Sequence, residues 1–104
     1  MNQFGAKVRQ AREASGLLLR ELAALLEVDP AILSKVERGE RPAKRELIPL
    51  LARHLKLKEK ELLTLWLAGR VYEMIKEEEV AAAALQVAEK AMQYHRKSKK
   101  PDQP

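Results

Sequence analysis

Residues 17–39, LLLRELAALLEVDPAILSKVERG, decide the fold of this chain. A first group of apolar residues recurs at the spacing of one helical face and consists of Leu22, Leu25 and Leu26. A second group follows after a short break, and its members, Leu33 and Val36, lie about one helical turn apart. The pattern predicts two short helices joined by a tight turn at Val28.

The start of the second helix carries a clear boundary signal. Asp29 precedes Pro30, so a carboxylate is available to the free amides of the first turn, and proline occupies the first helical position. Ala23 is small where two steeply crossed helices need to approach closely. Two helices joined in this way form a helix-turn-helix, which places its second helix in the major groove of DNA. The stretch therefore predicts DNA binding.

Charge and composition fit a polyanionic partner. The chain has 104 residues and a formal net charge of +5, and it contains no cysteine. Basic side chains outnumber acidic ones in residues 1–57 and 96–104, whereas acidic ones dominate in residues 58–95. The missing cysteines exclude disulfides and thiolate metal sites. No signal-peptide pattern or bilayer-spanning apolar stretch is visible, so we expect a soluble, cytoplasmic protein without membrane contact.

The chain is predicted to be all-helical, because Ala, Leu, Glu, Lys and Arg dominate and strand-like alternation is absent. Further helices are expected over residues 4–15, 45–55, from 58 or 59 onward, and 78–95. Pro49 has to fall in the first turn of its helix, and the buried stripe there should be Leu47, Leu50, Leu51 and Leu55. In the helix that follows, Trp66 and Tyr72 are expected in the core. We divide the chain into a DNA-binding domain (1–69), a helical dimerisation extension (70–95) and a disordered basic tail (96–104).

Residues 4–57 resemble the Cro/repressor-type (XRE) helix-turn-helix family. The matching positions are Arg12, Gly16-Leu17, Glu21-Leu22-Ala23, Val28, Ile32-Leu33-Ser34, Val36-Glu37-Arg38-Gly39, Arg41-Pro42 and Leu50-Ala52-Leu55. The resemblance implies a five-helix repressor-like domain ending in the helix at Leu62–Leu67, followed by a C-terminal helical extension. It also implies an ion pair between Arg12 and Glu37, both of which we interpret as structural.

The chain departs from the family pattern at two positions. Leu19 stands where the family usually has a glutamine that reaches DNA, which places that contact in question. Glu27 replaces the turn glycine, whose left-handed backbone is costly for a residue with a side chain. Neither change removes the fold.

Recognition of DNA is assigned to two groups of residues. The base readers would lie on the exposed N-terminal side of the second motif helix and are Pro30, Ala31, Ser34 and Lys35. The phosphate contacts would be Arg20, Arg38, Arg41, Lys44 and Arg45. The alternative is an ordinary solvated helix face and basic surface. Because the readers are chemically poor, DNA shape should supply much of the discrimination.

The last predicted helix carries two adjacent apolar stripes, more than one neighbour usually needs. One stripe could pack on the preceding helix and the other on a second subunit; alternatively, both pack within the chain's own core. The sequence does not choose between the stripes. The proposed dimer interface is therefore drawn from both, and comprises Val80, Ala84, Leu85, Val87, Ala88, Ala91 and Met92.

No catalytic residue, metal site or cofactor is predicted. His54 and His95 lie far apart in the sequence without a nucleophile motif, and no glycine-rich phosphate loop is present. The sequence shows no pocket for a small-molecule effector, and we expect none. We interpret the chain as a homodimeric regulator of transcription on a two-fold symmetric operator of double-stranded DNA. It would act by occluding RNA polymerase or by touching it.

Two alternatives from other classes remain. The first is an antitoxin or protein-interaction module whose helical C-terminus binds another protein. The second is a helical domain without affinity for DNA.

Overall fold

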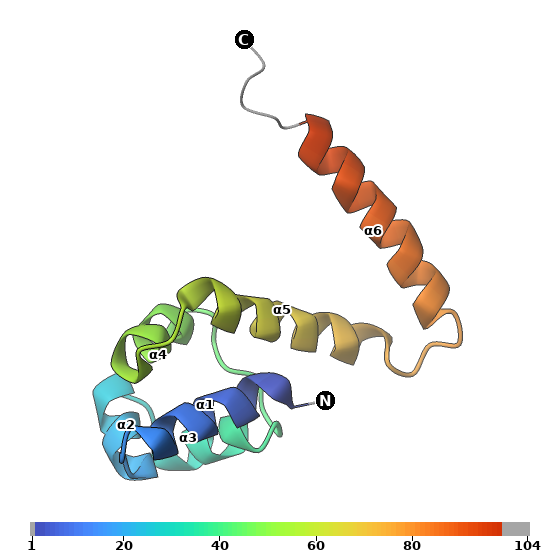
Figure 1. Cartoon of the computed structure of the whole chain (residues 1–104). Helices are drawn as coiled ribbons and strands as arrows, with labels where there is room; N and C mark the ends of the chain where they lie inside the picture. Colours follow the sequence, from blue (N-terminus) through green and yellow to red (C-terminus); the bar gives the residue numbers. More distant parts are fainter. Residues whose placement is uncertain (1, 99–104) are drawn as a thin grey trace. The chain divides into compact units, whose positions relative to one another are not determined.

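The computed structural model describes residues 2–98, and in this part of the chain all regular structure is helical (Figure 1). The six helices are α1 (Gln3–Ala14), α2 (Leu19–Leu26), α3 (Pro30–Glu37), α4 (Leu47–Leu55), α5 (Glu59–Ile75) and α6 (Ala81–Ser98). The prediction of an all-helical chain is confirmed. None of the described helices is long and apolar enough to cross a membrane.

The chain divides into two compact units. The first extends through Tyr72 and contains α1 to α4 and most of α5; the second begins at Glu73 and contains the end of α5 and all of α6. The helix-turn-helix lies entirely in the first unit, so the candidate site can be described from that unit alone.

One hydrophobic core holds the first unit together. Contacts between α2 and α3, and between α1 and α3, bring the motif against the first helix. Every helix of the unit contributes to the core, whose buried members are Val8, Leu22, Ala23, Leu26, Leu33, Ile48, Leu51, Ala52, Leu55 and Leu62. Ala23 is fully buried, as the close approach of α2 to its neighbours requires.

The buried faces of α2 and α4 differ in part from the predicted ones. Leu25 is 47% exposed, because Leu22, Ala23 and Leu26 form the inner face of α2. In α4 the buried stripe is Ile48, Leu51, Ala52 and Leu55, which follows the i, i+3, i+4, i+7 pattern. Leu47 and Leu50 lie at its edge and are only half-buried.

The turn of the motif is built as its residues predict. Glu27 ends α2 with φ 57° and ψ 44°, in the left-handed region that favours glycine. Asp29 then caps α3 by accepting a hydrogen bond from the Ala31 amide (2.7 Å), and Pro30 is the first helical residue. Lys56 ends α4 with φ 56° and ψ 44°, a second strained position that the sequence analysis missed.

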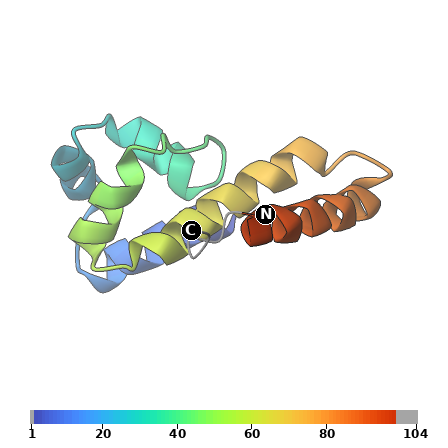
Figure 2. The same ribbon diagram turned by 90° about the horizontal axis from the view of Figure 1, so that it is seen from above.

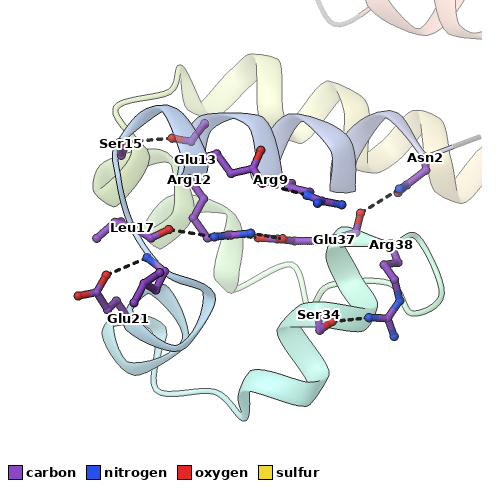
Figure 3. Close-up of polar contacts among 12 residues, drawn as sticks. Asn2, Arg9, Arg12, Glu13, Ser15, Leu17, Glu21, Ser34, Glu37 and Arg38 are labelled. Carbon is purple, nitrogen blue, oxygen red and sulfur yellow. Dashed lines mark hydrogen bonds and ion pairs between the residues drawn. The ribbon is translucent and has the colours of Figure 1, made fainter.

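A buried ion pair fixes the end of α3 against α1. Arg12 donates from Nε and Nη2 to the two carboxylate oxygens of Glu37, at 2.8 and 3.0 Å, and from Nη1 to the Leu17 carbonyl oxygen at 2.9 Å (Figure 3). These hydrogen bonds raise the pKa of Arg12 above its ordinary value. Within residues 2–98, Glu37 is the one charged side chain that is buried. The pair therefore links α1, the segment before α2, and α3.

The N-terminus of α1 approaches the same helix end very closely. The Asn2 side-chain amide donates to the Glu37 carbonyl oxygen at 2.9 Å (Figure 3). Gly5 permits this approach, since a Cβ there would lie 2.6 Å from that same oxygen. Gly39, with φ 77°, turns the chain away directly after α3.

The C-terminal part differs from the prediction in three respects. α6 begins at Ala81 rather than near Glu78, and it continues through Ser98. The predicted disordered tail is therefore wrong for Arg96–Ser98, where a basic last helical turn suits the helix dipole; residues 99–104 lie outside the described part. Tyr72, expected in the core, is 40% exposed, because the core ends with the first turns of α5.

Removing Arg12 should destabilise the fold strongly, because Glu37 would remain buried without a cation. We expect Arg12→Ala to lower the free energy of unfolding by about 3 kcal/mol in urea denaturation followed by circular dichroism. Arg9→Ala is the matched control, since it breaks an exposed pair with Glu13 in the same helix and should cost about 0.5 kcal/mol or less. Equal losses for the two variants would contradict a structural role of the Arg12 pair.

Candidate nucleic-acid interface

The outer face of α3 carries the predicted base readers. Pro30, Ala31 and Lys35 are exposed, and Ser34 is half-buried on the same helix. Leu33 and Val36 point inward to the core, so the two faces of α3 are clearly divided. Figure 2 shows α2 and α3 on either side of the turn that joins them. The exposed face of α3 is short and carries one cation, Lys35, among small side chains.

One of the backbone amides at the start of α2 is already occupied by an acidic side chain and is not available to a phosphate. The Glu21 carboxylate accepts a hydrogen bond from the Leu18 amide at 2.8 Å (Figure 3). Arg20 is exposed beside it. Leu19, at the position where the resemblance expects glutamine, packs against the hydrophobic core. The substitution thus replaces a polar contact with apolar packing, and Arg20 remains the cation available at this helix end.

Arg38 lies at the end of α3, is exposed, and is paired with neighbouring side chains of the same chain. Its Nε and Nη2 donate to the two Glu40 carboxylate oxygens at 2.9 and 3.1 Å, and its Nη1 donates to the Ser34 hydroxyl (Figure 3 shows the Ser34 contact). The Glu40 carboxylate raises the pKa of Arg38, and Arg38 holds the pKa of Glu40 below its ordinary value. Sequence analysis had assigned Arg38 to phosphate and Ser34 to bases, and it had given Glu40 no role.

The loop between α3 and α4 exposes further positive charge. Arg41, Lys44 and Arg45 are all exposed in this segment. Among the residues that the structure describes, neither Arg41 nor Lys44 forms an ion pair with an acidic side chain. Two cations without internal counter-ions therefore follow directly after the outer face of α3.

Trp66 of α5 holds the backbone of this loop through a hydrogen bond. Its indole N–H donates to the carbonyl oxygen of Ala43 at 2.8 Å, and Ala43 itself is buried. The guanidinium carbons of Arg45 and Arg70 lie 5.8 and 5.1 Å from the centre of the Trp66 ring, within cation–π range. The sequence analysis placed Trp66 in the core only. The indole N–H of a tryptophan in a protein core usually finds a hydrogen-bond acceptor, and this rule would have suggested the second role.

The described part of the chain contains no cluster of metal-ligating side chains. In residues 2–98 no three side chains of His, Cys, Asp or Glu gather as metal ligands would. A surface pocket of about 370 Å³ is present, and its lining carries one ionisable side chain; it is formed by Lys7, Gln10, Ala11, Ala14, Ser15, Leu55 and Leu57. Besides the Lys7 ammonium, the lining offers the Gln10 amide and the Ser15 hydroxyl, which donates to the Ala11 carbonyl oxygen at 2.8 Å; no acidic side chain lines this pocket.

The residues predicted for dimerisation all lie in or just before α6. None of the residues of α6 is buried, so both predicted stripes are exposed in the single chain. The largest apolar side chains among them keep substantial exposure: Val80 65%, Leu85 46%, Val87 70% and Met92 58%.

Comparisons with known proteins agree with this geometry. A family model described as a helix-turn-helix domain matches residues 3–65. The crystal structure of the restriction-modification controller protein C.AhdI from Aeromonas hydrophila is similar over 59% of this chain and 92% of its own, with 36% identity and a TM-score of 0.54. That of the clp gene regulator ClgR from Corynebacterium glutamicum is similar over 97% of this chain and 94% of its own, with 28% identity and a TM-score of 0.56. A comparison with curated proteins gave no match.

The anchoring role of Trp66 can be measured. Trp66→Phe keeps an aromatic ring but removes the donor to Ala43, so it should lower the free energy of unfolding by about 1 kcal/mol. Leu67→Ala, at a 43% exposed position of the same helix, is the control and should change it by about 0.5 kcal/mol or less. Urea denaturation followed by circular dichroism reads both variants. A Trp66→Phe chain as stable as the wild type would show that the hydrogen bond does not hold the loop.

Proposed function

The chain belongs to the Cro/repressor-type helix-turn-helix family, a class of DNA-binding regulators, and we propose that it controls transcription as a homodimer on a two-fold symmetric operator. The observation that carries the proposal is the exposed face of α3 with the cations of the following loop beside it. We assign DNA binding to residues 1–69, as a five-helix domain, and dimerisation to residues 70–95.

Affinity would come from phosphate contacts on both sides of α3. We assign Arg41 and Lys44 first, because within the described residues no acidic group has to be displaced from them. Arg20 would reach a phosphate at the start of α2. Arg45 would do so while its guanidinium stays near Trp66, and Arg38 after leaving Glu40. Neutralising phosphates releases counter-ions, so binding should weaken steeply as salt rises.

Sequence discrimination would rest on few groups. Lys35 can donate to guanine O6 and N7, and the Ser34 hydroxyl can bond to several base edges. Pro30 and Ala31 would only touch thymine methyl groups. With so few direct readers, the spacing of two half-sites and the shape of the DNA between them would supply the remaining specificity.

Pairing of two chains would use the exposed apolar side chains of the second unit. Val80, Leu85, Val87 and Met92 lie at i, i+5, i+7 and i+12, and small alanines stand between them. Two such helices related by a two-fold axis would cover each other's apolar side chains. A symmetric dimer can set its recognition helices about 34 Å apart, one turn of DNA.

The similar proteins support a regulatory role, which could be repression or activation of transcription. One is named a controller of a restriction-modification system and the other a regulator of clp genes. A dimer bound at an operator would act on RNA polymerase, either by blocking its site or by contacting it. The runner-up, an antitoxin or interaction module, would use the same exposed side chains of α6 for a different protein.

DNA recognition is tested by selecting bound duplexes from a random pool and titrating the best one. Arg41→Ala should weaken binding to all sequences alike and lower the slope of log affinity against log salt by about one. Lys35→Ala should instead relax preference at one or two symmetric base pairs, with a loss of about 1–3 kcal/mol on the selected site. Salt-independent binding, or two variants with the same profile, would contradict the assignment.

Dimerisation is tested by placing a charge among the exposed apolar residues of α6. Val87→Glu should give a folded monomer with much weaker operator binding, because a carboxylate would have to be buried between the subunits. Gln86→Glu is the matched control: it adds the same charge outside both stripes and should remain dimeric. Sedimentation velocity at about 20 µM measures the oligomeric state of both variants and of the wild type. A wild-type chain that is monomeric there would favour the interaction-module alternative.

A further inference from the structure

Glu40 occupies the Nε–Nη2 edge of Arg38, one of the two guanidinium edges that can bind a phosphate with two parallel hydrogen bonds. The Nε and Nη2 atoms form one edge of the guanidinium, and both donate to the Glu40 carboxylate. Two parallel N–H···O bonds of this kind are also the way in which arginine binds a phosphate. The third donor in use, Nη1, is directed to the Ser34 hydroxyl. Arg38 therefore cannot offer this edge to DNA while Glu40 remains in place.

We propose that Glu40 is an internal competitor of the DNA phosphate for Arg38 and thereby lowers the affinity of the site for DNA. The inference rests on the proposed DNA-binding function and adds an acidic determinant to it. On binding, a backbone phosphate takes the place of the Glu40 carboxylate on Arg38, and Glu40 turns into solvent.

The exposure of the pair makes this exchange possible. The Arg38 and Glu40 side chains are 50% and 55% exposed, so a phosphate can reach the guanidinium without unfolding any part of the core. Exposed ion pairs contribute little to stability, so little holds the internal pair together once a phosphate competes for it. Because Arg38 holds the pKa of Glu40 below its ordinary value, Glu40 stays charged at neutral pH and competes throughout the physiological range.

The position of Glu40 gives the competition a second effect, on base readout. Ser34, one of the two polar base readers proposed above, accepts a hydrogen bond from Nη1 of the same Arg38. When a phosphate displaces Glu40, Arg38 can follow the phosphate and leave Ser34. The oxygen of the Ser34 hydroxyl is then free to accept a hydrogen bond from a base edge. Phosphate contact and base contact are thereby coupled through one side chain.

Glu40→Gln tests the competition, because it removes the charge and keeps the shape. The measurement is the affinity of the full-length chain for the selected operator duplex and for a scrambled duplex of equal length. At low salt we expect Glu40→Gln to bind about twofold to fivefold more tightly than the wild type, as loss of an exposed ion pair allows. Glu46→Gln is the matched control, since Glu46 lies in the same loop and no arginine partner is found for it in residues 2–98.

The variant Arg38→Ala separates competition from simple charge removal. In the Arg38→Ala background, Glu40→Gln should give no further gain, because there is no guanidinium left to free. The same gain with and without Arg38, an equal gain from Glu46→Gln, or no gain at all would each overturn the proposal while leaving DNA binding intact. If the wild type and all variants bind neither duplex, the proposed function fails and this inference fails with it. Circular dichroism confirms that the variants are folded.

Discussion

The buried carboxylate of Glu37 is the group on which the remaining arrangement depends. It sits at the last residue of α3, where it loses water and gains two bonds from Arg12. The same arginine also holds the Leu17 carbonyl, so one guanidinium fixes α3 relative to both α1 and the entry to α2. α3 has eight residues and packs on α1 and α2 through its inner face, where Leu33 and Val36 are buried. The pair with Arg12 adds a fixed point at the C-terminal end of α3, while its N-terminal end and outer face stay exposed.

The loop after α3 continues this division between fixed and exposed groups. Its backbone is held at Ala43 by the Trp66 indole and turned at Gly39, whereas Arg41 and Lys44 project outward. Holding the backbone lowers the entropy that the loop loses when its side chains meet a phosphate. The proposed site thus combines a loop backbone that is held in place with exposed cations, and the exposed Glu40 carboxylate lies where a phosphate can replace it on Arg38.

The sequence predicted the frame better than its details. Residues with strong local preferences act within one turn, so Asp29 and Pro30 identified the start of α3 correctly. Pro49 does lie in the first turn of α4, although that helix begins at Leu47 rather than at residue 45. The misplaced face of α4 and the exposed Leu25 reflect packing among several helices, which periodicity within one helix does not contain. The Arg38 contacts to Glu40 and Ser34 depend on the loop geometry after α3, so the list of charged residues alone could not reveal them.

The position of Trp66 gives the protein a built-in optical probe. It is the single tryptophan of the chain, and it touches the loop through Ala43 and lies near the guanidinium of Arg45. A change in the distance or hydration of a nearby cation alters indole emission. Binding of DNA at the loop could therefore be followed in real time by the fluorescence of the unlabelled protein. Because α6 contains no tryptophan, this signal would be separate from pairing through α6.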